Sequence, residues 1–163
     1  MLSENKLQAM KYLKNEYFQL QNESSILAQL GCSIYLVDND FFHWKFSLSG
    51  PRDTPYADGL FYLRVYFPDN YPKSKPEVKF INKIYHLNVR PQDGHISIST
   101  WNSWKVGTPF LDVIAAIFIL FYQQNPFSPY SADMAKEYQN NRNKFDRKVK
   151  EWTKKYAPFP KNI

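Results

Sequence analysis

Apolar residues recur at three- and four-residue steps near the start of the chain, with Lys, Asn, Glu and Gln between them. The recurring positions are Leu7, Met10, Leu13, Tyr17 and Leu20. This spacing places them on one face of an amphipathic helix, for which Ser3 is a suitable N-cap. The pattern breaks at residues 22–25, so we predict that the first helix ends there.

The hydrophobic pattern then changes to strict alternation, which is typical of half-buried strands. The alternating apolar positions of the two clearest strands are Phe42, Trp44, Phe46 and Leu48, then Phe61, Leu63, Val65 and Phe67. Residues 34–37 and the pair Val78 and Phe80 predict a first and a fourth strand. Short intervals and turn-forming residues favour an antiparallel meander with one packed face. Its exposed face would carry His43, Lys45, Arg64 and Lys79.

Helical patterns return in the second half of the chain. Residues 114–121 are apolar all round, so we expect a central, buried helix that Thr108 and Pro109 begin. Ser131 can cap a short helix through Tyr138. The apolar face of a last helix consists of Phe145, Val149, Trp152 and Tyr156. A helix, four strands, a long loop over residues 82–104 and three helices predict an α+β domain.

Composition supports a single domain over residues 1–163. The chain is 44% hydrophobic, which is enough for a core and argues against disorder. Its one cysteine, Cys32, permits neither an internal disulfide nor a cysteine-based zinc site, and we predict no metal and no cofactor. The first ten residues are polar and do not resemble a signal peptide. The longest apolar run, residues 113–122, is too short to cross a bilayer, so we expect a soluble protein of the cytoplasm or nucleus with no membrane partner.

The net charge of +6 raises the possibility of an acidic partner such as nucleic acid. The basic residues are, however, spread along the chain and form no continuous basic helix. The sequence therefore disfavours nucleic acid as a partner, and a nucleic-acid-binding protein on this scaffold is the least supported interpretation.

Several segments, taken in order, resemble the ubiquitin-conjugating enzymes. They are GPRDTPY (residues 50–56), FPDNYP (67–72), YHLNV (85–89), GHISI (94–98), Trp104, NP (125–126) and WTKKYA (152–157). The resemblance extends over about residues 4–157 and implies the fold of that family, with an N-terminal helix, a four-stranded antiparallel meander, a long active-site loop, a central buried helix and two C-terminal helices. No single motif is specific, but their ordered sum is.

The resemblance implies that a residue accepts ubiquitin or a ubiquitin-like protein from an activating enzyme as a thioester and passes it to a lysine amine. Ser97 occupies the position of that catalytic cysteine. Asn88 corresponds to the asparagine that stabilises the oxyanion. His86 would brace the loop rather than act as an acid or base, and Ser128 lies at the family's gate position.

The chain also departs from the family pattern. A serine is a far weaker nucleophile than a thiolate without an activating base, and the G-x-S-x-G pattern of serine hydrolases is absent. Leu87 replaces the motif proline. Lys73 stands where many members have a hydrophobic residue that contacts RING-type ligases, and Lys105 and Val106 belong to an altered second ligase loop. A lysine at an interface core must be desolvated, so the usual RING contact is in doubt.

Two main interpretations stay open. In the first, the protein is a conjugating enzyme whose cysteine has been changed to serine, leaving it inactive or slow. In the second, Ser97 is native and the protein is a non-catalytic variant that binds ubiquitin, a partner conjugating enzyme or a ligase. The intact Asn88 favours the first, whereas Leu87 and Lys73 favour the second.

Overall fold

The first helix, α1 (Glu4–Asn22), begins at the predicted cap in the computed structural model, which describes residues 1–161. The Ser3 hydroxyl accepts a hydrogen bond from the Lys6 amide at 3.2 Å. A second helix, α2 (Ser24–Gln29), follows almost at once and was not predicted. It is only six residues long, which is too short to show a helical period in the sequence. Its buried residue, Leu27, packs it against the core.

The central sheet confirms the predicted meander. Its strands are β1 (Cys32–Val37), β2 (Asp40–Ser49), β3 (Leu60–Tyr66) and β4 (Glu77–Phe80), antiparallel and in that order. One face is completely buried through the alternating apolar residues of the two middle strands, Trp44, Phe46, Leu48, Phe61, Leu63 and Val65. The alternation of the sequence therefore assigned the correct residues to the core face.

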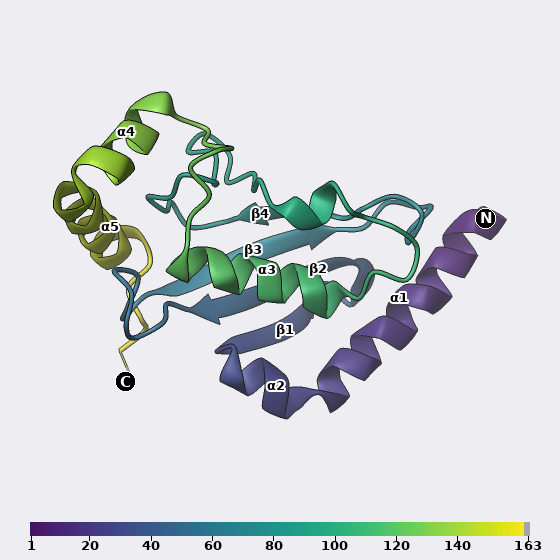
Figure 1. The fold of residues 1–163 in the computed structure, drawn as a ribbon. Helices are drawn as coiled ribbons and strands as arrows, with labels where there is room; N and C mark the ends of the chain where they lie inside the picture. The colour runs from purple at the N-terminus through teal and green to yellow at the C-terminus, as the bar shows by residue number, and fades with distance from the viewer. Residues whose placement is uncertain (162–163) are drawn as a thin grey trace.

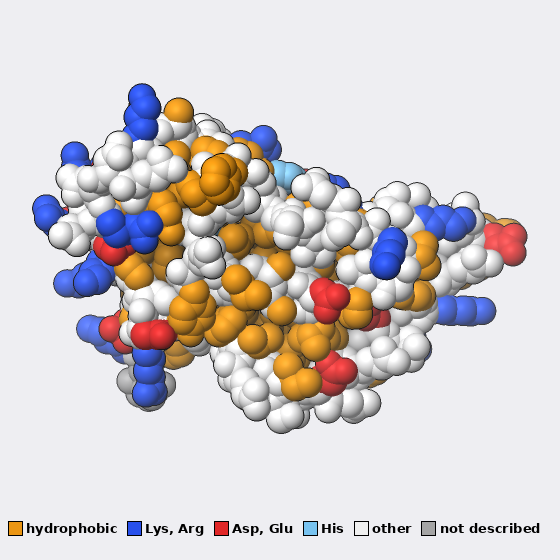
Figure 2. Space-filling view, viewed as in Figure 1, with side chains coloured by type: hydrophobic (Ala, Val, Ile, Leu, Met, Phe, Trp, Pro, Cys, Tyr) orange, Lys and Arg blue, Asp and Glu red, His pale blue; other side chains and the backbone are white. Residues whose placement is uncertain are grey.

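Helix α3 (Phe110–Tyr122) lies across the packed face of the sheet, at the centre of the molecule (Figure 1). From this helix, the Phe110 ring contacts the rings of Trp44 and Phe46, and the Phe121 ring contacts that of Phe61. The central position was predicted, but burial on all sides is wrong. Ile119 and Tyr122 are 57% and 51% exposed, because the helix has the sheet on one side only. Hydrophobic side chains accordingly gather on this face of the molecule (Figure 2).

The start of α3 also differs from the prediction. Pro109 is the N-cap rather than the first helical residue, and the Thr108 hydroxyl instead accepts from the Lys105 amide at 3.2 Å. The cap is supplied by α1: the Glu16 carboxylate accepts from the Phe110 amide at 2.7 Å. Burial raises the pKa of Glu16. A side chain 94 residues earlier thus satisfies the helix end and ties α1 to α3.

Helices α4 (Ala132–Asn140) and α5 (Arg142–Tyr156) pack together at one end of the sheet (Figure 1). Ser131 caps α4 as predicted, by accepting from the Met134 amide at 3.2 Å. Glu137 of α4 joins the two helices to the long loop, since it accepts from Tyr85 and from Lys148, both at 2.8 Å. Helices and sheet are segregated along the chain, which confirms the α+β class.

Candidate functional site

The predicted site segment lies between β4 and α3 and has only one helical turn, η1 (Ser99–Trp101). Within it the chain doubles back, and Val89 and Ile96 form an isolated antiparallel bridge. The reversal requires Gly94, which has φ +77° and approaches the Phe80 carbonyl so closely that an added Cβ would lie 2.1 Å from its oxygen. This turn brings the YHLNV and GHISI segments side by side.

Asn88 and Ser97 meet at this reversal. The Ser97 amide donates to the Asn88 carbonyl oxygen at 2.8 Å, so their backbones are directly paired. Ser97 is half-buried, and solvent reaches part of it. The structure thus brings together the two residues that the sequence analysis placed at the centre of the site, although they are nine positions apart.

No base stands ready to activate the serine. Among the hydrogen bonds of residues 1–161, none joins the Ser97 hydroxyl to a histidine, and both ring nitrogens of His86 are used elsewhere. The protein's thiol is not an alternative nucleophile, because Cys32 is buried in β1 and burial raises its pKa to about 12. Position 97 therefore has the exposure of a nucleophile without the partner that a serine needs.

The side chain of Asn88 is fully buried and every polar atom on it is paired. Its amide nitrogen donates to the carbonyl oxygens of Asn125 and Ser128, at 2.9 and 3.1 Å. Its carbonyl oxygen accepts from the Asn125 amide at 2.8 Å. Asn88 thus fastens the segment that follows α3 to the site loop, and both of its N–H donors are occupied in this conformation.

His86 braces the same loop. Its Nδ1 accepts from the Asn88 amide at 3.0 Å, which requires a neutral ring whose Nε2 donates to the Leu120 carbonyl at 2.9 Å. Burial lowers the pKa of His86 to about 4. A proton on Nδ1 would face the Asn88 N–H, so the fold favours the neutral tautomer, which suits a bracing role.

We expect the buried neutral His86 to make folding stability depend on pH. Its folded pKa lies below the ordinary value of 6.5, so the unfolded state binds the extra proton between pH 6.5 and about 4. The stabilisation is present above pH 6.5 and is lost as the pH falls through 4; at about 1.4 kcal/mol per pKa unit it amounts to about 3 kcal/mol. NMR titration should show the His86 ring still neutral at pH 5, while a midpoint near 6.5 would contradict this.

Leu87 shows how the loop manages without the motif proline. Leu87 is fully buried, and its amide, which a proline would lack, donates to the Gln124 side chain at 2.7 Å. Gln124 in turn donates to the Tyr56 hydroxyl at 2.8 Å, and Tyr56 donates to the Tyr85 carbonyl at 2.6 Å. Gln124 was not identified from the sequence, since a glutamine in a loop shows no pattern. Its hydrogen bonds replace the constraint that the proline would have supplied.

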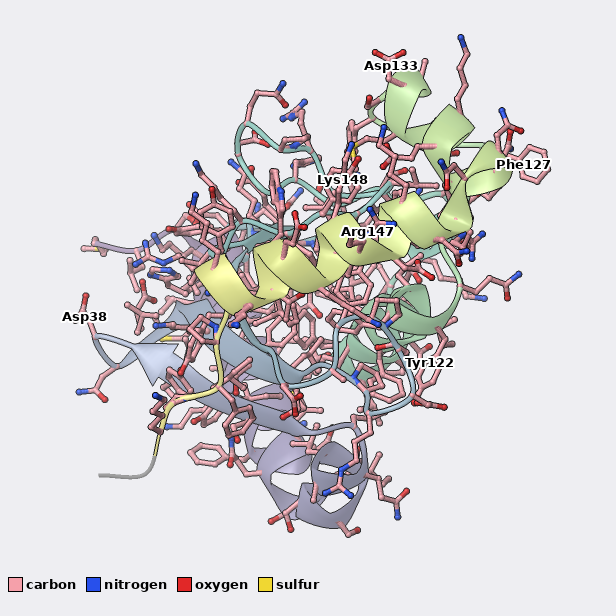
Figure 3. All side chains as sticks on the ribbon, turned by 90° about the vertical axis from the view of Figure 1, so that its left-hand side faces the viewer. Asp38, Tyr122, Phe127, Asp133, Arg147 and Lys148 are labelled. Carbon is pink, nitrogen blue, oxygen red and sulfur yellow. The ribbon has the colours of Figure 1, made fainter. Side chains whose placement is uncertain are left out.

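Residues 125–128, which follow α3, form a rim beside the site loop, and the hydrogen bonds of Asn88 to Asn125 and Ser128 act as a clamp on this rim. Ser128 is exposed and contributes its carbonyl oxygen to the clamp. Phe127 is 91% exposed and projects away from the body of the molecule (Figure 3). Its amide donates to the Asn125 side chain at 2.9 Å, so the rim is ordered on both sides of the exposed ring.

Two of the predicted partner-binding residues lie together on a second surface. Lys73 and Val106 line one groove with Tyr12 of α1, and Val106 is 62% exposed. The Trp104 indole donates to the Pro72 carbonyl at 3.0 Å and joins the two loops. Lys105 is exposed beside Val106 but does not line the groove. A cation therefore stands in an otherwise partly apolar groove.

Neither metal chemistry nor membrane insertion has structural support in the described part of the chain. Over residues 1–161, no three His, Cys, Asp or Glu side chains form a group that could hold a metal ion. No helix in the same range is long and apolar enough to cross a membrane.

Comparison with known proteins gives the geometry a context. The family description for ubiquitin-conjugating enzyme matches residues 13–153 of this chain. The chain is also similar to "Ubiquitin conjugating enzyme E2 B" of Dictyostelium discoideum, with 36% identity over 126 residues, which cover 77% of this chain and 85% of that protein.

Solved structures show the same arrangement. A crystal structure from Plasmodium yoelii, described as a ubiquitin-conjugating enzyme, superposes with a TM-score of 0.83 and 30% identity, covering 93% of this chain and 97% of the other. The E2 domain of a ubiquitin-conjugating enzyme from Toxoplasma gondii gives 0.75 and 31%, covering 87% and 99%. The sheet with its N-terminal and C-terminal helices is therefore the predicted ubiquitin-conjugating-enzyme fold. On the match to the family and the identity to its members, the chain belongs to the ubiquitin-conjugating enzyme family.

Proposed function

We propose that position 97 is the attachment point for ubiquitin or a ubiquitin-like protein, and that the cysteine form passes this modifier to a lysine amine. The observation that carries the proposal is the 2.8 Å hydrogen bond from the Ser97 amide to the Asn88 carbonyl. This bond joins the YHLNV and GHISI segments and fixes Ser97 at a half-buried position of the site loop. A reacting carbonyl can reach that position from solvent.

The chemistry follows from the nucleophile. In the cysteine form, the thiolate attacks the thioester carbonyl of the activated modifier, a new C–S bond forms and the activating enzyme's sulfur leaves. A lysine amine then attacks the new thioester, the C–S bond breaks, and the amine loses its proton as the amide forms. With Ser97, the first attack needs a base to remove the hydroxyl proton. Since the site offers none, the chain as written should be inactive or slow.

Partners should then act on more than one surface. The modifier and its activating enzyme are required by the chemistry. The exposed apolar face of α3, with Ile119 and Tyr122, marks a surface suited to a protein partner. In the groove at Lys73 and Val106, a RING-type ligase with an apolar contact would have to desolvate the lysine ammonium. A ligase or partner conjugating enzyme that places a carboxylate there fits better.

The unaltered protein provides the first test. Incubated with an activating enzyme, ATP and ubiquitin or a ubiquitin-like protein, it should form a slow adduct that thiol reductants do not cleave, because an oxyester replaces the thioester. The Ser97→Ala protein should form none. An adduct that persists in Ser97→Ala would place the attachment elsewhere and overturn the proposal.

A second candidate function is that of a non-catalytic module that binds ubiquitin or another conjugating enzyme. The observation in its favour is that both N–H groups of Asn88 are already bound to Asn125 and Ser128, so neither is free for an oxyanion. This candidate predicts that neither Ser97 nor a cysteine in its place is charged by an activating enzyme, although NMR shows saturable binding of unactivated ubiquitin.

A further inference from the structure

Three cations that the sequence pattern assigned to the exposed face of the sheet, Lys45, Arg64 and Lys79, form a continuous row in the structure. Lys45 of β2 is directly opposite Arg64 of β3, and Arg64 is directly opposite Lys79 of β4. Paired residues of an antiparallel sheet point to the same face. Three cations from three strands therefore stand side by side across the face that faces away from α3.

This arrangement costs folding energy, because like charges directly opposite one another on neighbouring strands repel. Lys79 is partly neutralised by Glu77 at 3.1 Å. Among residues 1–161, neither Lys45 nor Arg64 forms an ion pair with a carboxylate within 4.0 Å. A repulsive row that the protein leaves uncompensated at its centre indicates an anion supplied from outside.

Aromatic rings surround the same row. The Lys45 ammonium lies 4.7 Å from the centre of the Tyr62 ring and 5.9 Å from that of Tyr35, while the Tyr66 ring stacks on His43 at 4.3 Å. Tyr35 and Tyr66 are 38% and 40% exposed. Rings on an exposed sheet face are stacking surfaces for nucleobases, as cations beside them are for phosphates.

The face that carries these cations and rings is not covered by any helix of the described residues. α3 lies on one side of the sheet, and no helix of residues 1–161 lies on the other (Figure 1). In the side view the strands form the left-hand boundary of the body, with Asp38 at the end of the β1–β2 hairpin (Figure 3). The carboxylates on or near the face are Glu77 on β4, Asp93, whose pKa is lowered by its hydrogen bond with Arg90 and also by the nearby charge of Lys79, and Asp38 and Asp40 at the hairpin end. They lie at the two ends of the row, away from Lys45 and Arg64 at its centre.

We propose that this face, defined by Lys45, Arg64 and Lys79 with Tyr35, Tyr62 and Tyr66, binds single-stranded nucleic acid. The cations contact successive phosphates and the tyrosines stack on bases without reading a particular sequence. An acidic polypeptide could satisfy the charges but would leave the rings without a stacking partner, so nucleic acid is the better fit. The inference does not depend on the chemistry proposed for position 97.

The test is fluorescence anisotropy with labelled oligo(dT) and oligo(rU) of about 12 nucleotides, long enough for one such platform. The full chain is compared with the pair Lys45→Ser and Arg64→Ser. The matched control removes the same charge from exposed positions of α5, with Lys150→Ser and Lys154→Ser. The sheet pair should weaken binding at least about tenfold and reduce the slope of log K against log salt by about 1.4, for two lost phosphate contacts, while the control changes binding less than about twofold.

Two more measurements make the result decisive. Tyr35→Leu with Tyr62→Leu should weaken binding about tenfold at constant charge, through lost stacking. The sheet pair should melt no lower than the control pair, because it relieves repulsion; a lower melting temperature would contradict that premise. Equal losses in both pairs, or no binding at low salt, would overturn the inference. So would polyglutamate that competes as well as the oligonucleotide with no effect of the tyrosine changes, which would identify an acidic-polypeptide surface instead.

Discussion

The Ser97→Cys protein should accept ubiquitin or a ubiquitin-like protein from an activating enzyme and ATP, in an adduct that thiol reductants cleave. The thiolate needs no general base, and such a base ordinarily contributes on the order of 100-fold or more to an oxygen nucleophile. We therefore expect charging at least about 100-fold faster than in the unaltered protein, measured as the band shift on a non-reducing gel over time.

A neighbouring serine gives the matched control. Ser99→Cys introduces the same thiol two residues away, at an exposed position in η1. The Ser99→Cys protein should not accept the modifier, because position 99 lies in η1 and its backbone is not paired with Asn88. Cys32 serves as an internal control in every variant, since its buried thiol remains protonated. Equal charging of the Ser99→Cys protein would show that any accessible thiol suffices and that position 97 has no special place.

Loss of the Asn88 side chain should have the largest effect on stability. Asn88→Ala removes the three hydrogen bonds of a fully buried side chain and leaves groups of Asn125 and Ser128 without their partner. We expect the free energy of unfolding in urea to fall by about 3 kcal/mol. Asn143→Ala, at an exposed position of α5, should change it by less than about 0.5 kcal/mol. A loss below about 1 kcal/mol for Asn88→Ala would contradict the clamp.

The same substitution separates the clamp from an oxyanion role. In the Ser97→Cys background, at a temperature where the variant remains folded, loss of an oxyanion donor should slow transfer to free lysine on the order of 100-fold without slowing charging. For this role the Asn88 amide must release the Asn125 or Ser128 carbonyl during transfer. Unchanged transfer would leave Asn88 as a clamp alone.

The fold could be predicted from the sequence wherever a periodic pattern met a buried face. Alternation over Phe42 to Leu48 and over Phe61 to Phe67 assigned the two middle strands, and helical spacing found α1 and α5. The apolar run of α3 gave the right element but the wrong surroundings. Hydrophobicity alone does not distinguish a helix packed on all sides from one whose outer face is left for a partner, as at Ile119 and Tyr122.

The site could be predicted only as a set of positions. Ordered motifs identified Ser97, Asn88 and His86, and the structure brings these three together. The contacts that fix them were not predictable, because each joins residues far apart in the chain: Asn88 with Asn125 and Ser128, and Leu87 with Gln124. The Glu16 cap on α3 was likewise not predictable. Alternation placed Lys45, Arg64 and Lys79 on the exposed face of the sheet, but not directly opposite one another, because that depends on the strand register.

We expect this scaffold to hold a nucleophile at position 97 beside Asn88, with the modifier joined to that residue alone. The most direct measurement is tandem mass spectrometry of the charged Ser97→Cys protein, digested under non-reducing conditions. We predict one modifier per chain, joined through its terminal carboxyl group to the residue 97 sulfur and absent after treatment with a thiol. Attachment to a lysine or to Cys32, or no attachment with ubiquitin or any ubiquitin-like protein, would contradict it.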